Sequence, residues 1–333
     1  MADKKLEFDT IDQLQAVFGT QDHLVRLIER AFNVNINFHG SEIEVRGDAP
    51  AGVEGAASVM DTMQDIYDQG ENIDDEMVYR LIEETADGDP GETSRAMGDV
   101  VAVTYKGAPV RCKTPGQKNY IKALRENTVT LCIGPAGTGK TYLAVAQAVK
   151  ELKDGEIERI IMSRPAIEAG EERLGFLPGD LAQKVDPYLR PLYDALYDMY
   201  GPEKADKLRE KGTIEIAPLA YMRGRTLNHA RIIIDESQNA SLSTLKMALT
   251  RLGEGSKMVL TGDVTQIDLP KKQDSGLEKC ANILSSIDDI GIVRLQNRDV
   301  VRNKIVRDIV KAFEKEEEKF KSASTRSSRT RKK

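Results

Sequence analysis

Gly134-Pro135-Ala136-Gly137-Thr138-Gly139-Lys140-Thr141 is the stretch that decides the fold of this chain of 333 residues. It follows the pattern G-x-x-x-x-G-K-T, in which glycines let the main chain wrap closely around a phosphate group. The N–H groups of such a loop, and of the helix that begins there, attract the anion. The eight residues therefore predict a site for ATP, with Lys140 at the β- and γ-phosphates and the Thr141 hydroxyl on Mg²⁺.

The segments on either side of this loop have the composition that a phosphate-binding loop requires. Residues 128–133 form a short apolar run typical of a buried strand, and residues 142–152 carry apolar side chains at helical spacing. The alternative is a glycine-rich turn with a chance lysine, which needs neither a strand before it nor a helix after it. The strand-like segment before the loop and the helix-like segment after it therefore favour a nucleotide site over a chance turn.

A second candidate element is the hydrophobic run at 231–234, which ends in Asp235-Glu236. We expect this strand end to face the loop, because neighbouring parallel strands place their carboxyl ends at one crevice. Asp235 would then hold Mg²⁺, directly or through water, and Glu236 would polarise the attacking water. The alternative is an exposed strand end, where acidic residues are common.

Two glutamines are further candidates. Residues 260–266 indicate a third strand and a polar turn, where Gln266 could hydrogen-bond the γ-phosphate or the attacking water. Gly262 and Asp263 also suit a turn for structural reasons alone. Gln117 lies at the start of a helix pattern at 118–125, and its amide could bind the edge of adenine. A purely structural role at the helix start is equally open.

Composition and charge limit the class of protein. The length allows about two domains, and no apolar run approaches the roughly 20 residues of a membrane helix. The start of the chain lacks a signal-peptide pattern, and three widely spaced cysteines suit a reducing compartment. We therefore expect a cytoplasmic protein without a membrane role. The net charge of −6 argues against non-specific coating of nucleic acid.

The pattern along the chain predicts two domains, a linker and a tail. Residues 1–85 indicate a small α+β domain, with helices at 12–17, 21–32, 51–69 and 74–84 and a hairpin that turns at His39-Gly40-Ser41. Residues 86–98, rich in Gly, Pro and charge, predict a linker. Residues 99–315 alternate strands and helices, which predicts an α/β domain with a parallel, doubly wound sheet. The expected strands are 128–133, 159–163, 214–217, 230–234, 257–261 and 291–295.

The tail at 316–333 is charged and becomes basic at its end. From residue 322 onward it contains five basic residues and no acidic one. A solvated, disordered end fits this composition. A basic arm that binds RNA or a partner protein fits it as well.

Taken in order, these elements resemble a set of motifs of superfamily-one helicases. The set consists of Gln117, the loop at 134–141, Ser163-Arg164-Pro165-Ala166, Asp235-Glu236-Ser237-Gln238-Asn239 and Gly262-Asp263-Val264-Thr265-Gln266. Over residues 98–315 the chain resembles the PhoH family more closely still. That resemblance rests on the loop and on the stretches 164–171, 174–180, 184–191, 215–228, 249–253 and 299–302.

The resemblance implies an ATPase with a single RecA-like core that uses ATP and Mg²⁺ and acts in RNA metabolism. It implies an RNA-dependent ATPase or helicase-like remodelling enzyme, linked to ribosomal RNA processing and acting on single-stranded or ribosomal RNA. The alternative is a nucleotide-gated scaffold that binds a YbeY-type endoribonuclease without unwinding RNA. A P-loop kinase is a third hypothesis, but the paired Asp235 and Glu236 and the 262–266 turn favour water as the acceptor.

Residues 1–85 resemble a KH-like domain, with two helices around a turn and a following hairpin. A KH site uses a G-x-x-G turn that lets the RNA backbone approach closely. Here the turn is Gly19-Thr20-Gln21-Asp22, where Asp22 replaces the second glycine and would repel phosphate. RNA binding and a protein-interaction or assembly role are both open for this domain.

A superfamily-one helicase closes ATP between two RecA-like domains, and the second domain supplies an arginine finger. Too little chain follows Gln266 for a second such domain. We therefore expect a neighbouring subunit to supply the finger in a homo-oligomeric ring, a hexamer by resemblance to the family. Arg302 is the first candidate for this catalytic arginine, with Arg223, Arg225 and Arg164 as the others.

Overall fold

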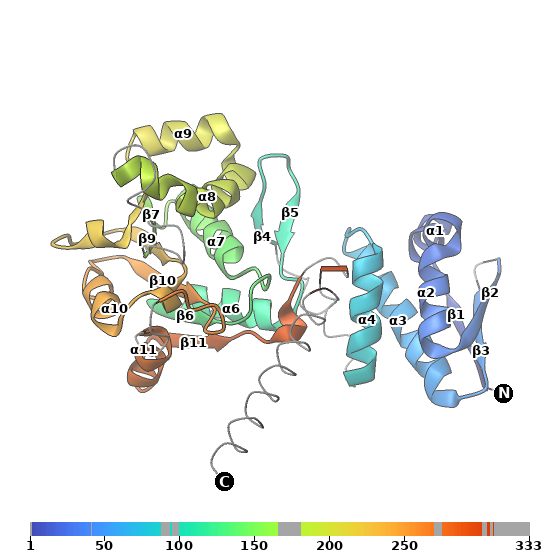
Figure 1. Cartoon of the computed structure of the whole chain (residues 1–333). Helices are drawn as coiled ribbons and strands as arrows, with labels where there is room; N and C mark the ends of the chain where they lie inside the picture. Colours follow the sequence, from blue (N-terminus) through green and yellow to red (C-terminus); the bar gives the residue numbers. More distant parts are fainter. Residues whose placement is uncertain are drawn as a thin grey trace, which may run out of the picture. The chain divides into compact units, whose positions relative to one another are not determined.

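A computed structural model describes residues 2–40, 42–87, 94, 100–165, 181–269, 275–301, 305, 306 and 309; the side chains at 39, 86, 87 and 181–187 are not described. The chain divides into two compact units. One is Met1–Ser94 with Val301–Lys333, and the other is Arg95–Val300. Figure 1 labels most of the helices and strands of both units along the chain.

The first unit is a three-stranded antiparallel sheet with helices packed on it, with strand order β1-β3-β2. Its elements are β1 (Ala2–Glu7), α1 (Ile11–Phe18), the 3-10 turn η1 (Thr20–Asp22), α2 (His23–Phe32), β2 (Val34–His39), β3 (Glu42–Gly47), α3 (Pro50–Asp68) and α4 (Asp75–Asp87). Ile43 and Val45 of β3 and Met60 and Met63 of α3 are fully buried and lie in its core. The predicted α+β architecture and the predicted hairpin are confirmed.

Two details of this unit differ from the prediction. Residues 2–7 form strand β1, which the sequence did not indicate. Only Leu6 of β1 is buried, so this charged edge strand has almost no apolar alternation to recognise. The second helix begins at His23 rather than at residue 21, because Gln21 and Asp22 have φ values of 55° and 59° and cannot continue a right-handed helix.

The second unit contains a six-stranded parallel sheet with strand order β11-β6-β10-β9-β7-β8. The strands are β6 (Val129–Ile133), β7 (Arg159–Arg164), β8 (Ile214–Pro218), β9 (Ala230–Ile234), β10 (Lys257–Gly262) and β11 (Ile290–Arg294). Each begins and ends within one residue of its predicted position. The α/β class with a parallel sheet is confirmed.

Helices cover both faces of this sheet. They are α6 (Pro115–Glu126), α7 (Lys140–Asp154), α8 (Leu181–Tyr200), α9 (Pro202–Glu210), α10 (Leu242–Leu249) and α11 (Leu277–Leu284), with the short 3-10 turns η3 (Leu219–Met222), η4 (Ser237–Asn239) and η6 (Asn297–Asp299). Cys132 and Ile233 pack with α6, α7 and α8, whereas Leu131 and Ile232 pack with α10 and α11. Side chains that alternate along a strand therefore enter two separate cores, and this explains why β6 and β9 are apolar throughout.

A small antiparallel hairpin precedes α6 and was not predicted. It consists of β4 (Val100–Val103) and β5 (Pro109–Arg111). Val101 and Val110 pack into the same core as α7. Runs of four and three residues are too short to carry a recognisable strand period.

The helices that the structure describes contain both apolar and charged side chains. The longest, α8, has 20 residues and contains both aromatic and charged side chains. Within the part of the chain that the structure describes, no helix combines the length and the apolar composition of a membrane span.

Candidate functional site

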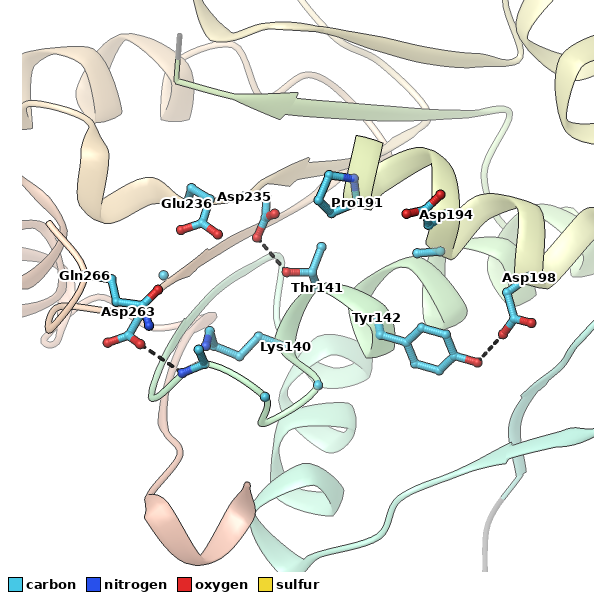
Figure 2. Close-up of a pocket in the computed structure, with 15 residues that line it drawn as sticks. Lys140, Thr141, Tyr142, Pro191, Asp194, Asp198, Asp235, Glu236, Asp263 and Gln266 are labelled. Carbon is cyan, nitrogen blue, oxygen red and sulfur yellow. Dashed lines mark hydrogen bonds between the residues drawn. The ribbon is translucent and has the colours of Figure 1, made fainter. Parts of the chain in front are cut away.

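The carboxyl ends of β6, β9 and β10 open into a cavity of about 500 Å³, which Figure 2 shows. Ligands of open parallel sheets bind outside these strand ends. The cavity is lined by residues of the glycine-rich loop, of α7 and α8, and of the segments after β9 and β10. These residues are Ala136, Gly137, Gly139, Lys140, Thr141, Tyr142, Pro191, Asp194, Ala195, Asp198, Asp235, Glu236, Gly262, Asp263 and Gln266.

The strand order corrects one expectation about this cavity. The strand that ends before Asp235 is not the direct neighbour of the loop strand, because β10 lies between β6 and β9. In β10, Leu260 is opposite Leu131 on one side and Ile234 on the other. The order of strands depends on long-range packing, which the spacing of motifs along the chain does not encode.

The loop after β6 has a backbone that requires glycine. Gly137 and Gly139 have φ values of 85° and 77°, a region that other residues rarely adopt. At Gly134 a Cβ atom would lie 2.7 Å from Cβ of Leu295 and 2.9 Å from its carbonyl oxygen. The three glycines therefore allow the loop to curl between β6 and α7 against the end of β11.

Lys140, the first residue of α7, holds its ammonium group inside the loop. Its Nζ donates to the carbonyl oxygens of Gly134 at 2.7 Å and Pro135 at 2.8 Å, and the residue is 8% exposed. Burial lowers the pKa of Lys140, whereas Cys132 and nearby carboxylates such as Asp263 act in the opposite direction. The loop thus presents a positive charge to the cavity.

Asp235 is the most buried carboxylate of the cavity, with a side chain 3% exposed. Its Oδ1 accepts hydrogen bonds from the hydroxyls of Thr141 and Thr261, each at 2.6 Å. Its Oδ2 accepts from Nε of Arg164 at 2.8 Å and from Nη2 at 2.6 Å. The structure therefore brings Thr141 and Asp235 together, and it adds Thr261 and Arg164 as further partners of the same carboxylate.

Glu236 follows Asp235 in a left-handed conformation, with φ of 54°. Its Oε2 accepts from Nε2 of Gln238 at 2.5 Å. The same nitrogen donates to the carbonyl of Gln266 at 3.0 Å, and Oε1 of Gln238 accepts from the N–H of Asp263 at 3.1 Å. Gln238 is fully buried. The sequence placed Gln238 in a motif without a role, and its position as a link between the two strand ends is visible only in three dimensions.

The turn after β10 touches the glycine-rich loop directly. Oδ2 of Asp263 accepts from the N–H of Ala136 at 2.9 Å. Oδ1 of Asp263 accepts from the N–H of Thr265 at 2.9 Å and from its hydroxyl at 2.6 Å. Gln266 is exposed and lines the cavity. Asp263, interpreted from the sequence as a turn residue alone, therefore also bridges the turn to the loop.

Gln117 lies in the first turn of α6 and is 4% exposed. Its Oε1 accepts from the N–H of Lys113 at 2.6 Å, and its Nε2 donates to the carbonyl of Thr138 at 3.2 Å. Thr114 caps the helix by accepting from the N–H of Gln117 at 3.1 Å, and it donates to Asp299 at 2.7 Å. These contacts tie the helix start to the loop, and contact with adenine stays a prediction.

One wall of the cavity comes from α8, which the sequence did not connect to the site. The hydroxyl of Tyr142 donates to Oδ2 of Asp198 at 2.6 Å, and Pro191 and Asp194 line the same wall. Burial and the bond to Asp198 raise the pKa of Tyr142, so its phenol stays a neutral donor. Pro191 ends the stretch 184–191, which carried the family resemblance without a role at the site, and no motif marks Asp194 or Asp198. These residues reach the site only through helix packing.

The donors around Asp235 fit a Mg²⁺ ion bound together with phosphate. Mg²⁺ prefers oxygen ligands and is usually held by one or two carboxylates plus substrate phosphates rather than by an all-protein cage. Thr141 and Asp235 supply a hydroxyl and a carboxylate 2.6 Å apart. Among the described residues no cluster of three or more His, Cys, Asp or Glu side chains could hold a metal by itself.

The candidate finger arginines differ in their surroundings. Arg225 forms a two-point ion pair with Glu215, with Nη2 to Oε2 at 2.6 Å. Arg223 is exposed. Arg302 lies outside the described residues, as do residues 166–180 with the motif stretches that they contain.

Comparison with known proteins places the second unit in a family. Residues 109–314 match the family model described as PhoH-like protein. The chain belongs to the PhoH family. A PhoH-like protein of Bacillus subtilis (strain 168) is 46% identical over 305 residues, which cover 92% of this chain and 95% of that protein. A PhoH-like protein of Synechocystis is 57% identical over 218 residues, which cover 66% of each chain.

The matches to solved structures are more distant. The Sulfolobus solfataricus SWI2/SNF2 ATPase core in complex with dsDNA matches with a TM-score of 0.34 and 16% identity, over 55% of this chain and 44% of that one. The Pif1 helicase from Candida albicans matches with a TM-score of 0.28 and 15% identity, over 55% of this chain and 40% of that one. The PhoH-family chain thus spans less than half of either structure.

Family membership and the geometry of the loop together define the general class. The second unit is a P-loop nucleotide-binding domain of the ATPase type, built on the parallel sheet described above. The glycine-rich loop, its lysine and the Asp235-Glu236 strand end lie at one cavity of that domain.

Proposed function

We propose that the chain is a Mg²⁺-dependent ATPase that acts in RNA metabolism. The observation that carries this proposal is the convergence of Lys140, Thr141, Asp235 and Glu236 on one cavity. An ammonium group in a glycine-rich loop supports binding of a triphosphate. A hydroxyl and a carboxylate in contact support a bound Mg²⁺, which would polarise the phosphoryl group.

The proposed roles follow from position and chemistry. The main-chain N–H groups of residues 134–141 bind the phosphates, and Lys140 neutralises their charge. Thr141 and Asp235 hold Mg²⁺. Glu236, 40% exposed at its side chain, orients and polarises the attacking water. Gln266, which also lines the cavity, reports the state of the terminal phosphate. Gln117, whose side chain ties the start of α6 to the loop, is proposed to contact the nucleotide base.

We propose that RNA is the macromolecule on which ATP hydrolysis acts, through remodelling linked to ribosomal RNA processing. Support comes from the order of the helicase-like motifs along the chain. The second candidate is a scaffold whose nucleotide state controls binding of a YbeY-type endoribonuclease. The bond from Gln238 to both Glu236 and Gln266 supports either function, because it couples hydrolysis to a loop at the surface.

ATP turnover measured with single-stranded RNA, with single-stranded DNA and with neither separates these candidates. Remodelling predicts that RNA stimulates turnover at least several-fold more than DNA does. Equal turnover in all three, together with nuclease binding that changes between ATP and ADP, supports the scaffold instead. No turnover and no nucleotide binding by folded protein would contradict the ATPase proposal itself.

We further propose a homo-oligomeric ring, a hexamer, in which a neighbouring subunit completes the site. Among the described candidates, Arg223 suits a finger that acts on another subunit, because it is exposed, whereas Arg225 is engaged by Glu215 and Arg164 by Asp235. ATPase activity per subunit should therefore fall on dilution through the range where the assembly dissociates. Specific activity that stays constant far below that range would rule out a finger supplied between subunits.

We propose the cytoplasm as the compartment. Cys112, Cys132 and Cys280 are buried, and these three thiols, all within the described residues, form no disulfide. A reducing compartment suits this state. Fractionation of cells followed by detection of the chain would test the assignment, and recovery with the membrane or outside the cell would contradict it.

A further inference from the structure

The end of β7 places a cation directly on the site carboxylate. In the sheet register, Ser163 of β7 is opposite Ile234 of β9, and the N–H of Asp235 donates to the carbonyl of Ser163 at 2.8 Å. The next residue along β7 is Arg164, so the two strand ends present an arginine and an aspartate side by side. The side chain of Arg164 is only 16% exposed.

The carboxylate of Asp235 is saturated with hydrogen bonds. A carboxylate offers about four lone-pair positions for donors. Thr141 and Thr261 each donate to Oδ1, and Nε and Nη2 of Arg164 both donate to Oδ2. A divalent ion that takes Asp235 as a direct ligand must therefore replace one of these donors.

Arg164 is the donor that a cation would replace at Oδ2. Two positive charges cannot share one carboxylate oxygen without strong repulsion, because the site is buried and poorly screened. Without either cation, however, Asp235 would be a buried charge lacking a counter-charge, which is strongly unfavourable. The pair thus balances the charge of Asp235 and holds its carboxylate in place while it opposes the metal.

We propose that Arg164 is a positioning residue that competes with the divalent ion for Asp235 and is released when the metal–nucleotide complex binds. The inference rests on the proposed function of the cavity and concerns how the same site is controlled. It assigns Arg164 a role within its own subunit, in place of the finger role considered from the sequence. Because Arg164 competes for Asp235, the site binds a divalent ion more weakly than it would if Arg164 were absent.

The released side chain also changes a contact with α8. Nη1 of Arg164 donates to the carbonyl of Tyr188 in α8 at 2.8 Å. The cavity wall residues Pro191, Asp194 and Asp198 follow on the same helix. When the metal replaces Arg164 at Asp235, the hydrogen bond from Arg164 to Tyr188 is lost and this part of α8 becomes more mobile. The mobility of α8 then depends on the metal and not on the nucleotide alone.

The test measures metal affinity in the full-length chain rather than turnover. Mn²⁺ is titrated into protein saturated with ADP in metal-free buffer, and free Mn²⁺ is followed by electron paramagnetic resonance. In Arg164→Gln, Mn²⁺ should bind roughly tenfold more tightly than in the unmodified chain, because one charge-assisted competitor is removed. Arg159→Gln, at the other end of β7, is the matched control for loss of a positive charge and should leave Mn²⁺ affinity unchanged.

Unchanged or weaker Mn²⁺ binding in Arg164→Gln would overturn the proposal, since it would mean that Arg164 does not compete or that it supports the metal. Binding of ADP without metal is measured in parallel with a fluorescent analogue. If the unmodified chain binds no ADP, the proposed function fails; if it binds ADP but the two Mn²⁺ affinities agree, only the competition fails.

Arg164→Lys is a second variant, for use if Arg164→Gln does not fold. Lysine keeps the charge but loses the two N–H groups that reach one carboxylate oxygen. Arg164→Lys should bind Mn²⁺ more tightly than the unmodified chain but less tightly than Arg164→Gln. An affinity equal to or below that of the unmodified chain contradicts the proposal.

Amide hydrogen exchange around residues 188–195 supplies a second readout. Adding Mn²⁺ to the ADP complex should raise exchange there in the unmodified chain and not in Arg164→Gln, whereas no rise in the unmodified chain contradicts the link to α8.

Discussion

At the scale of single residues, the cavity depends on charged groups that are each held by several neighbours. Lys140 is fixed by two loop carbonyls, and Asp235 by two hydroxyls and a guanidinium. Such fixed groups need little reorganisation when a ligand's charge arrives, which is the physical basis of electrostatic catalysis. Substitutions at these positions should therefore separate binding from chemistry.

Lys140→Ala and Glu236→Gln should have opposite signatures. Lys140→Ala removes a charge-assisted donor to the phosphates, and nucleotide affinity should fall roughly ten- to hundredfold. Glu236→Gln keeps the shape of the side chain but not its basicity, so ATP should bind within a few-fold while hydrolysis falls by about 10²- to 10⁴-fold. Calorimetry and single-turnover hydrolysis measure the two effects. Normal turnover by Glu236→Gln would show that another group acts on the water.

Gln238→Ala should slow hydrolysis without abolishing nucleotide binding. The change removes the donor that holds the Glu236 carboxylate and leaves the buried N–H of Asp263 without its acceptor. Misplacement of a catalytic group by about 1 Å can cost roughly 10²-fold in rate. Single-turnover hydrolysis at saturating ATP measures the effect. Asn239→Ala is the matched control, because Asn239 pairs with Asp268 instead, and equal loss in both variants would argue for a general effect on the turn.

At the scale of elements, the turn between α1 and α2 combines an unusual backbone with an unfavourable charge. Gly19, Gln21 and Asp22 all have positive φ, and a Cβ atom at Gly19 would lie 2.7 Å from the ring of His23. The backbone of this turn is therefore tightly curved. Asp22, which is exposed, adds a negative charge where a G-x-x-G turn has none.

Asp22→Gly should increase affinity for single-stranded RNA if this turn contacts the RNA backbone. The change removes a repelling charge, and glycine accepts φ of 59° without strain. Asp22→Asn is the matched control for charge, since asparagine tolerates the same backbone but keeps a side chain. Fluorescence anisotropy with labelled RNA measures the affinities. Equal, unchanged affinities in both variants would favour a protein-interaction role for the first unit.

At the scale of the whole molecule, a buried ion pair joins three elements of the second unit. Arg231 of β9 and Glu151 of α7 have side chains 1% and 4% exposed, with Nε to Oε2 at 2.7 Å. Arg231 also donates to the carbonyl of Leu124 in α6 at 3.1 Å. Arg231 begins the run of β9 that leads to Asp235, so the pair anchors the base of the strand that carries the site.

Glu151→Gln should destabilise the second unit by about 3–5 kcal/mol, because it leaves the buried guanidinium without its counter-charge. The double variant Glu151→Leu with Arg231→Met removes both charges and should lose much less. Urea unfolding followed by circular dichroism, with nucleotide absent, measures both free energies. Equal losses for the two variants would show that packing, rather than the uncompensated charge, accounts for the effect.

How much of the protein could be predicted from sequence depends on the range of the interactions involved. The six strands of the parallel sheet were predicted within one residue at each end, because continuous apolar runs between turns report burial on both faces. Strand β1 and the β4–β5 hairpin were missed, because short or one-sided strands leave too few alternating residues. The contacts of Gln238 and Asp263 were missed for a different reason, since each joins segments more than 20 residues apart.

The sequence by itself determined the glycine-rich loop, the apolar strands and the carboxylates that follow β9, since glycine dihedrals and strand periods are properties of adjacent residues. Only the tertiary structure decided that β10 lies between β6 and β9, that residues of α8 line the cavity, and that Arg164 forms an ion pair with Asp235. Strand order and helix docking depend on which distant surfaces pack together, and this information is spread over the whole core rather than contained in any motif.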